Sequence, residues 1–338
     1  MKNVTIKDIA KVAKVSYATV SRALSDSNEI SSETRKRILN ICDEMGYTPN
    51  FVARSMVAKQ THLLGLIVGS INNPFMSELA YHVELHARQF GYTIMLCNSQ
   101  HDTKLEANAF SLLLGQRVDG ILIIPASTES RAALQPNLHK LPTVFISENL
   151  RDLPESYVST DNQRGTFAGM EYLYGLGHRD ILYFGRRKRS TTHTLRAKGY
   201  TDACKQYGLT PQFFDNASGE SSIACGYRMG LNLFSRPFTF TAIFAATDTL
   251  ALGILQAADE CGVSIPGQVS LLGFDNITYA GMPRINLSSI EQPKDVMAAV
   301  AVEMLVERIR DDTVGYSHRV LQPRLIERGS CCPPVPAK

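Results

Sequence analysis

The sequence has no stretch that is long and apolar enough to cross a membrane. Its apolar runs, such as Leu63–Val68 and Ile121–Ile124, are short, whereas a membrane-spanning helix needs about 20 such residues. Charged residues such as Lys2, Lys7 and Asp8 interrupt the first twenty positions, so they form no signal-peptide core. We therefore expect a cytoplasmic protein with no membrane partner.

Paired cysteines are also missing. The seven cysteines are scattered and odd in number, and no CxxC pair occurs. These features disfavour a disulfide framework or a zinc ribbon, and we expect neither a metal nor a cofactor. Cys331 and Cys332 are adjacent in a Pro-rich tail. A flexible thiol pair is the simpler interpretation of them, and a redox switch is the alternative.

Catalytic motifs are absent as well. No G-x-S-x-G occurs, and no Gly-rich phosphate loop follows an expected strand. The run His82-Val-Glu-Leu-His86 places its glutamate in neither position that zinc proteases use, so both histidines are interpreted as polar-face helix residues. The sequence thus disfavours an enzyme.

The basic residues are concentrated near the N-terminus. Residues 1–60 hold ten Lys and Arg against six Asp and Glu, a net charge of +4, while the remainder holds 25 against 26, or −1. This asymmetry favours a nucleic-acid contact in the first 60 residues.

The first 46 residues predict three short helices. Ile6, Ile9, Ala10 and Ala13 recur at helical spacing after a possible N-cap at Thr5. A break at Lys14-Val15 precedes a second helix that Ser16 can cap, and a third helix runs from about Ser31 to Met45.

Beyond residue 60, short apolar strands alternate with amphipathic helices, which is typical of parallel α/β sheets. About 260 residues of this pattern exceed one sheet, so we expect two lobes. The expected strands are Leu63–Val68, Tyr92–Leu96, Gly120–Ile124, Thr143–Ile146, Ile181–Phe184, Ala242–Ala245 and Val269–Leu272. The expected helices are Phe75–Phe90, Gln163–Gly175, Leu250–Cys261 and Val296–Arg310. This part alone would also suit a transport-type binding protein, which the N-terminal 60 residues and the lack of a signal peptide disfavour.

The first two helices have the spacing and chemistry of a helix-turn-helix, in which the second helix presents polar and basic side chains to base edges. Arg22 can pair with guanine, Tyr17 can hydrogen-bond, and Ala18 can pack on a thymine methyl group. Ser21 lies on the same face. Thr5, Ser16 and Thr19 are placed to contact phosphates, which fix register without reading sequence.

The run from Ile6-Lys-Asp-Ile-Ala to Val-Ser-Arg22, followed by Gly46-Tyr-Thr-Pro-Asn50, resembles the lactose repressor/galactose repressor family. Later similar blocks include Ala245-Ala-Thr-Asp-Thr-Leu and Gly273-Phe-Asp-Asn. The resemblance covers about Val4 to Ser330. It implies a transcription regulator, expected to be a repressor, that binds double-stranded operator DNA as a homodimer under the control of a small polar effector. A sugar is the expected effector, with a purine-type metabolite as the alternative.

The resemblance also implies a domain plan: an N-terminal all-α helix-turn-helix domain plus an α/β two-lobed sensor like the periplasmic binding proteins, with parallel sheets. The expected segments are a DNA-binding domain at 1–48, a hinge helix at 49–60, an effector-binding and dimerisation domain at 61–330, and a flexible tail at 331–338. Lobe one is expected at about 61–160 and 293–321, and lobe two at about 161–291 and 322–330.

The hinge helix of the family inserts an apolar side chain into the minor groove, which kinks DNA. Here the resemblance assigns DNA contacts to Asn50, Ala53, Arg54 and Met56, where Met56 stands in place of the usual leucine. Methionine is long enough to act as the wedge but is more flexible.

Matching positions nominate the effector-binding residues Asn73, Phe75, Met76, Arg196, Thr247, Asp275 and Gln292. Such groups fork onto hydroxyls or a carboxylate, and a ring packs on a sugar face. Three alternatives remain: Arg196 as a surface ion-pair partner, Phe75 as a core residue, and Asp248 as a helix N-cap rather than a ligand.

Two departures from the family concern this pocket. Ser221 replaces a common aromatic residue, and Ser147 replaces a common Asp or Asn. The run Arg186–Arg189 is interpreted as a solvated loop, with a phosphate contact as the alternative. No leucine heptads follow Ser330, so we expect a dimer rather than a tetramer, with Phe75–Phe90 and Leu250–Cys261 as candidate faces.

Overall fold

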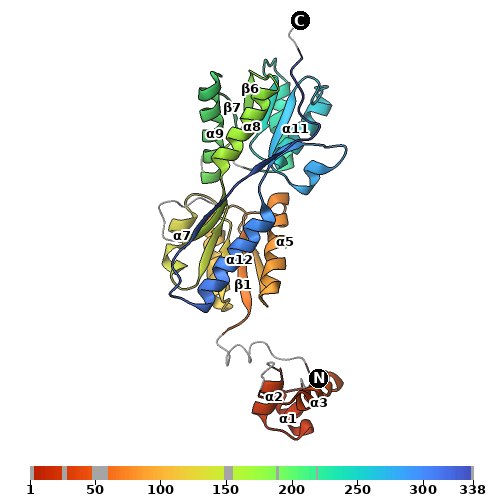
Figure 1. Cartoon of the computed structure of the whole chain (residues 1–338), viewed down its shortest axis with the longest axis vertical. Coiled ribbons are helices and arrows are strands. Elements are labelled where there is room, and N and C mark those ends of the chain that lie inside the picture. Colours follow the sequence, from red (N-terminus) through yellow and green to blue (C-terminus); the bar gives the residue numbers. More distant parts are fainter. Residues whose placement is uncertain are drawn as a thin grey trace. The chain divides into compact units, whose positions relative to one another are not determined.

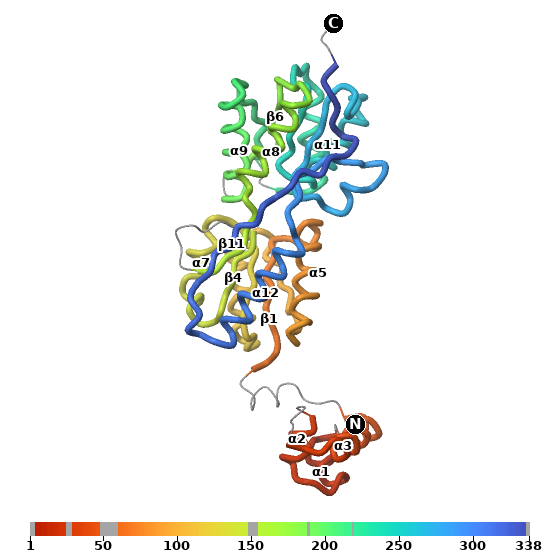
Figure 2. Tube along the Cα trace, viewed as in Figure 1, coloured from red at the N-terminus to blue at the C-terminus, as the bar shows by residue number. Residues whose placement is uncertain are grey.

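The computed structural model describes residues 4–24, 29–47, 60–147, 155–187, 190–217 and 220–335. The chain divides into two compact units, Met1–Thr61 and His62–Lys338, shown as cartoon and trace in Figures 1 and 2. None of the helices in the described ranges is long and apolar enough to cross a membrane.

The N-terminal unit contains three helices, α1 (Ile6–Ala13), α2 (Tyr17–Leu24) and α3 (Ser32–Glu44). One apolar core joins them, and its buried members are Ile9, Ala10, Ala13, Val20, Ala23, Ile38 and Cys42. The tight turn between α1 and α2 forms because Lys14 adopts a left-handed conformation, with φ of 52°. Ser16 then caps α2, since its Oγ accepts the Thr19 N–H at 3.0 Å.

The first sheet of the second unit has the strand order β11-β5-β4-β3-β1-β2, and all of its strands are parallel. Its strands are β1 (Leu63–Val68), β2 (Thr93–Asn98), β3 (Gly120–Ile123), β4 (Thr143–Ile146), β5 (Ser156–Thr160) and β11 (His318–Leu321). The helices α5 (Pro74–Gln89), α6 (Thr103–Gly115), α7 (Ser130–Leu138) and α12 (Lys294–Arg310) complete lobe one. Figures 1 and 2 show α5 and α12 side by side.

The second sheet has the order β12-β10-β9-β8-β6-β7, and only β12 runs antiparallel to its neighbour among these described strands. Its strands are β6 (Ile181–Arg186), β7 (Gln212–Asp215), β8 (Ala242–Ala245), β9 (Ser270–Asp275), β10 (Ser288–Glu291) and β12 (Arg324–Ile326). With α8 (Asn162–Gly175), α9 (Thr191–Tyr207), α10 (Ile223–Phe234), α11 (Asp248–Glu260) and the 3-10 turn η1 (Thr278–Gly281), they form lobe two.

The chain crosses between the lobes three times: between β5 and α8, between β10 and α12, and between β11 and β12. The last crossing is the dark-blue segment that runs from one lobe to the other in Figure 2. Parallel strands end at one edge of each sheet, and ligands bind in the crevice outside such carboxyl ends. The fold therefore predicts a ligand-binding site at the loops that follow β1, β4, β6, β8 and β9.

Only residues 331–335 of the expected flexible tail at 331–338 are described, and they contact lobe two. Among the described residues, the Cys332 N–H donates to Ser270 Oγ at 3.0 Å, and the Cys331 thiol donates to the Leu271 carbonyl at 3.2 Å. Burial raises the pKa of Cys331 to about 12, which leaves little reactive thiolate. The prediction of a flexible thiol pair is therefore wrong, because lobe two supplies hydrogen-bond partners for Cys331 and Cys332.

Candidate functional site

The exposed face of α2 holds the residues predicted to read bases. Tyr17, Ala18 and Arg22 are exposed, while Ser21 is half-buried and Val20 is part of the core. Tyr17 leaves 49% of its surface exposed, which is unusual for a large ring. The helix thus buries one face in the three-helix core and presents the other to solvent.

Arg22 forms an exposed ion pair with Glu29, with Nε 3.1 Å from the carboxylate and both side chains more than half exposed (55% and 67%). An exposed pair of this kind contributes about 0–1 kcal/mol. Arg22 can therefore leave Glu29 for another hydrogen-bond acceptor at little cost in free energy.

The predicted phosphate contacts lie at helix N-termini, which attract anions. Thr5 is the N-cap of α1, and its N–H and hydroxyl both donate to Asp8, at 2.9 and 2.6 Å. Ser16 and Thr19 share a hydroxyl hydrogen bond of 2.8 Å at the start of α2. Asn50, Ala53, Arg54 and Met56 lie outside the described residues.

The seven nominated effector residues line one small cavity between the lobes, of about 80 Å³, which we name the inner cavity. Most of them follow the carboxyl ends of strands, as the fold requires. Its full lining is Asn73, Phe75, Met76, His101, Ile124, Pro125, Ala126, Ser147, Arg187, Ser190, Thr192, His193, Arg196, Ser221, Thr247, Asp275 and Gln292.

A buried ion pair forms the floor of the inner cavity in lobe two. Arg196 Nη2 lies 3.1 Å from Asp275 Oδ1, and only 2% and 3% of the two residues are exposed. Gln292 Nε2 donates to the same carboxylate oxygen at 2.7 Å. The surface ion pair considered for Arg196 is thus excluded.

Three further contacts hold the guanidinium of Arg196 in place. It donates to Asn162 Oδ1 at 2.8 Å and to the Ala246 carbonyl at 2.6 Å, and it stacks 3.7 Å from the centre of the Phe274 ring. Such a network satisfies a buried charge that would otherwise be costly.

Asp248 is not the N-cap of α11, contrary to the expectation. Thr247 is the N-cap, because its Oγ1 accepts the Leu250 N–H at 3.3 Å. Asp248 instead accepts hydrogen bonds from Ser289 Oγ at 2.6 Å and the Ile277 N–H at 2.9 Å. Complete burial, and then the charge of Asp275, raises the pKa of Asp248 to about 7.

The lobe-one residues that line the inner cavity also have structural roles. Asn73 is the N-cap of α5, since its Oδ1 accepts the Phe75 N–H at 3.0 Å. Phe75 is 6% exposed and belongs to the core as well as to the cavity wall, so it is a core residue, and its contact with an effector stays a prediction. Met76 Sδ accepts the Ser70 N–H at 3.2 Å.

Single hydrogen bonds join the lobes around the inner cavity. Thr192 Oγ1 donates to the Ser147 carbonyl at 2.7 Å, and Asn73 Nδ2 donates to the Ser221 carbonyl at 3.4 Å. The Thr278 N–H also donates to Glu78 of α5 at 2.8 Å. Ser147 and Ser221, the two departures from the family pattern, thus offer backbone acceptors at the mouth of the cavity.

The sequence prediction missed five polar residues of the inner cavity: His101, Ser190, Thr192, His193 and Arg187, the last of which appeared only as part of a basic run. His193 and Arg196 are three apart on α9, so helical spacing could have linked them. Burial, followed by Arg187, lowers the pKa of His101, and burial with Arg187, Arg196 and His101 lowers that of His193 well below its usual value. Both imidazoles are therefore neutral at pH 7.

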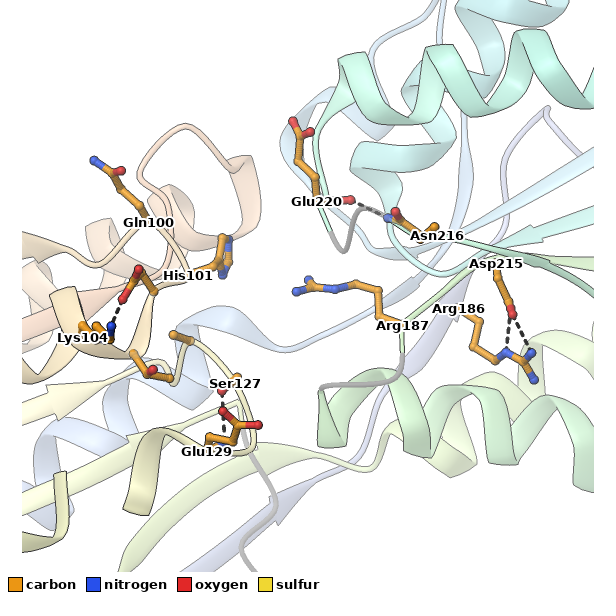
Figure 3. A pocket seen from close by; sticks show the side chains of 14 residues that line it. Gln100, His101, Lys104, Ser127, Glu129, Arg186, Arg187, Asp215, Asn216 and Glu220 are labelled. Carbon is orange, nitrogen blue, oxygen red and sulfur yellow. Dashed lines mark hydrogen bonds and ion pairs between the residues drawn. The ribbon is translucent and has the colours of Figure 1, made fainter. Parts of the chain in front are cut away.

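A second, larger cavity of about 960 Å³ adjoins the first, and we name it the outer cavity. Figure 3 shows Arg187 extended across it toward His101, while Arg186 turns toward Asp215. The Arg186–Asp215 pair is bidentate, at 2.7 and 2.8 Å. Within the basic run, Arg186 thus forms an ion pair and Arg187 lines a cavity wall, while residues 188–189 lie outside the described residues.

The histidine pair on α5 has a structural explanation. His82 and His86 both contact Asp295 of α12, at 3.1 and 2.9 Å. In the described ranges, no group of three His, Cys, Asp or Glu residues is arranged to hold a metal. These histidines join α5 to α12 instead of forming a polar face that meets only solvent.

Residues 5–50 match the family described as bacterial regulatory proteins, lacI family, and residues 170–331 match the periplasmic binding protein-like domain. The chain is 34% identical to the transcriptional regulator DegA of Bacillus subtilis, over 97% of this chain and 98% of that protein. It is 30% identical to the ribose operon repressor of Escherichia coli, over 96% and 99%.

Two solved structures are similar to the chain. The lac repressor dimer bound to operator and the anti-inducer ONPF aligns with a TM-score of 0.85 at 25% identity, over 98% of this chain and 100% of that one. A LacI-family regulator from Enterococcus faecium with bound ribose aligns with a TM-score of 0.71 at 25% identity, over 80% and 99%.

A helix-turn-helix unit followed by a two-lobed binding-protein fold defines a class of DNA-binding transcription regulators, and the relatives matched here are regulators rather than enzymes. The chain belongs to the LacI family of bacterial regulatory proteins. The predicted family and fold class are confirmed.

The raised pKa of Asp248 predicts a pH dependence of stability. An ordinary aspartate titrates near pH 3.9 when unfolded, whereas Asp248 titrates at about 7 when folded. The folded state therefore binds the extra proton, and this contribution to the free energy of unfolding is lost as pH rises from about 4 to 7. Denaturant titrations across this range should show a smaller fall for Asp248→Asn than for the unmodified protein.

Asp259→Asn is the matched control, because Asp259 is an exposed carboxylate on the same helix. Its stability profile should run parallel to that of the unmodified chain. Parallel profiles for Asp248→Asn as well would contradict the raised pKa of Asp248 in the folded state.

Proposed function

We propose that this protein represses transcription in the cytoplasm by binding a pseudo-palindromic operator as a homodimer, and that a sugar-like effector in the inner cavity changes its DNA affinity. The observation that carries the proposal is that the seven residues nominated by the family resemblance all line one cavity between two lobes. The lac repressor dimer bound to operator and the regulator with bound ribose support it by similarity.

On this proposal α2 enters the major groove, and the exposed side chains of Tyr17, Ala18 and Arg22 meet base edges. The N-termini of α1 and α2 then face phosphates through Thr5, Ser16 and Thr19. Arg22 then leaves Glu29 and pairs with the edge of a guanine instead.

Arg22→Ala should weaken binding to the preferred operator by about 1–3 kcal/mol and relax selectivity at one base pair in each half-site. Fluorescence anisotropy with a set of single-position operator variants measures both effects. Glu29→Gln is the matched comparison, because it removes the ion-pair partner and keeps the arginine; affinity should hold or increase.

Thr5→Ala should weaken all sequences by the same factor, as expected for a phosphate contact. If Arg22→Ala also lowers every operator variant equally, Arg22 contacts a phosphate and does not read a base.

A dimer is expected because a single helix-turn-helix buries too little surface for tight specific binding. Exposed apolar side chains that suit a subunit contact lie around α5 and η1, namely Ile71, Tyr81, Tyr279 and Met282, and we name them the apolar patch. The Thr278–Glu78 hydrogen bond places η1 beside α5, so the patch continues across both lobes. By contrast, α11, the other candidate face, is mostly buried.

Light scattering at micromolar concentration should give about twice the chain mass of 37.3 kDa. Tyr81→Glu places a charge in the centre of the patch and should produce monomers with weakened operator binding. Tyr316→Glu is the control, because Tyr316 is similarly exposed (53% against 60%) but lies outside the patch. A Tyr81→Glu protein that remains dimeric would show that the subunits associate elsewhere.

The inner cavity offers the groups that polyhydroxylated ligands need: a carboxylate, a guanidinium and an amide beside an aromatic ring. Gln292 Oε1 is buried without a hydrogen-bond partner in the described part of the chain. An unsatisfied buried acceptor is costly, and a ligand hydroxyl would satisfy it.

Ligands that raise the melting temperature in a screen of sugars, sugar derivatives and nucleosides should change operator affinity about 5- to 150-fold, with reciprocal coupling. Asp275→Asn should remove most of this response; because it also breaks the buried ion pair, its melting temperature without ligand is measured alongside to show that the fold is kept. Asp259→Asn should respond normally. A full response by Asp275→Asn would refute the inner cavity as the effector site.

A further inference from the structure

The two lobes line the inner cavity with different chemistry. Its described apolar lining residues all belong to lobe one, namely Phe75, Met76, Ile124, Pro125 and Ala126. Among the described residues, lobe two contributes only polar side chains, which are Arg187, Ser190, Thr192, His193, Arg196, Ser221, Thr247 and Asp275. A ligand that matches this cavity therefore has one apolar face and a polar edge.

A single sugar ring has this distribution of polarity, because its C–H groups form an apolar face and its hydroxyl groups lie around the edge. A purine base has two apolar faces, and proteins commonly bind a base by stacking it between aromatic or apolar side chains. Ser221 stands where the family pattern has an aromatic residue, and in the described ranges no Phe or Tyr of lobe two lines the cavity. The lining thus favours a sugar ring over a purine.

Two buried side chains of the inner cavity have polar atoms that no described residue satisfies. These atoms are Nδ1 of His193 and Oε1 of Gln292, and only 5% and 1% of the two residues are exposed. Buried polar groups in folded proteins nearly always form hydrogen bonds, and a missing bond is costly. Both side chains therefore offer a hydrogen bond to a ligand in the cavity.

The ion pair on the cavity floor links these two side chains. His193 and Arg196 are three residues apart on α9, a spacing that places Cβ atoms about 5–6 Å apart on one helix face. Gln292 Nε2 donates to Asp275 Oδ1 at 2.7 Å, and the same oxygen lies 3.1 Å from Arg196 Nη2. Asp275 thus fixes the orientation of the Gln292 carboxamide, and the two free groups lie at either end of one polar network.

The chemistry of both groups suits a hydroxyl. Burial, followed by the charges of Arg187 and Arg196, lowers the pKa of His193 well below its usual value, so the imidazole is neutral at pH 7. A neutral imidazole has one N–H donor and one acceptor nitrogen, and a hydroxyl can pair with either. Gln292 Oε1 only accepts, and a hydroxyl can donate to it.

We propose that His193 is a specificity-determining residue of the effector site. Its imidazole and the Gln292 carboxamide each bind a hydroxyl group of a single sugar ring, whose apolar face packs on lobe one at Phe75 and Ile124. The inference rests on the proposed function, namely that the inner cavity holds the effector. It adds the form of the ligand and a residue that selects it.

Calorimetry on the full-length protein tests the inference with ribose, arabinose, glucose, galactose and fructose, and with adenosine and hypoxanthine as purine probes. At least one sugar should bind more tightly than both purine probes. Each sugar that binds is then compared with its complete set of mono-deoxy analogues. At least one analogue should bind about tenfold or more weakly, because a site that hydrogen-bonds a hydroxyl discriminates against a ligand that lacks it.

His193→Leu removes both ring nitrogens and should lower the affinity for that sugar about tenfold. The variant should also bind one of the discriminated deoxy analogues as well as it binds the parent sugar, since the two changes remove the same hydrogen bond. His193→Asn keeps a hydrogen-bonding group near the position of Nδ1 and should retain much of the affinity.

His139→Leu is the matched control, because it makes the same exchange at an exposed histidine at the end of α7, outside the cavity lining. This variant should bind the sugar and its analogues like the unmodified protein. Melting temperatures without ligand show whether each variant is folded.

Unchanged sugar affinity in His193→Leu, with the same discrimination among deoxy analogues, would overturn the inference and leave the proposed function intact. Equal losses in His193→Leu and His193→Asn would also overturn it, because they would assign the effect to shape rather than to a hydrogen bond. Tighter binding of a purine probe than of every sugar would overturn the form of the ligand. If no probe binds and none changes operator affinity, both the inference and the proposal of a sugar-like effector are rejected.

Discussion

The ion pair between Arg196 and Asp275 is the constraint on which the sensor depends. Two buried charges are tolerable only together, and removing one partner of such a pair typically costs about 3–5 kcal/mol. Because Arg196 also bonds to Asn162 and Ala246, the pair ties the start of α8 and the end of β8 to α9 and β9. The ion pair therefore holds the residues of the cavity floor together, and the edge of the sheet determines where that floor lies.

Much of this fold could be predicted from the sequence, because strands buried on both faces are continuous apolar runs. The bounds of β1, β4 and β8 were predicted as the structure has them. Five short strands, β5, β7, β10, β11 and β12, were missed. The strand β5, for example, is Ser-Tyr-Val-Ser-Thr. Its serines and threonine are buried in a sheet on which elements such as α12 pack, and a single sequence does not show such tertiary neighbours.

The residues of the candidate site, too, could be predicted only in part. Residues at the ends of apolar strands, such as Thr247 and Asp275, could be nominated because parallel strands place their carboxyl ends together. The roles of adjacent residues could not: Thr247 rather than Asp248 caps α11 because of its extended backbone, with φ of −148° and ψ of 155°. His193 was missed because its burial arises from tertiary packing. The residues of the hinge segment, including Met56, lie outside the described ranges, so their DNA contacts stay predictions.

The hydrogen bonds that join the lobes have a consequence for how the inner cavity can open. Each such bond contributes about 0.5–1.5 kcal/mol, and the bonds are separate from the ion pair: Thr192 donates to Ser147 and Asn73 to Ser221, while Lys294 of α12 donates to two backbone carbonyls of lobe two. When the lobes part, Arg196 and Asp275 stay together, since both belong to lobe two. The inner cavity can therefore open and close without disturbing the charged pair on its floor.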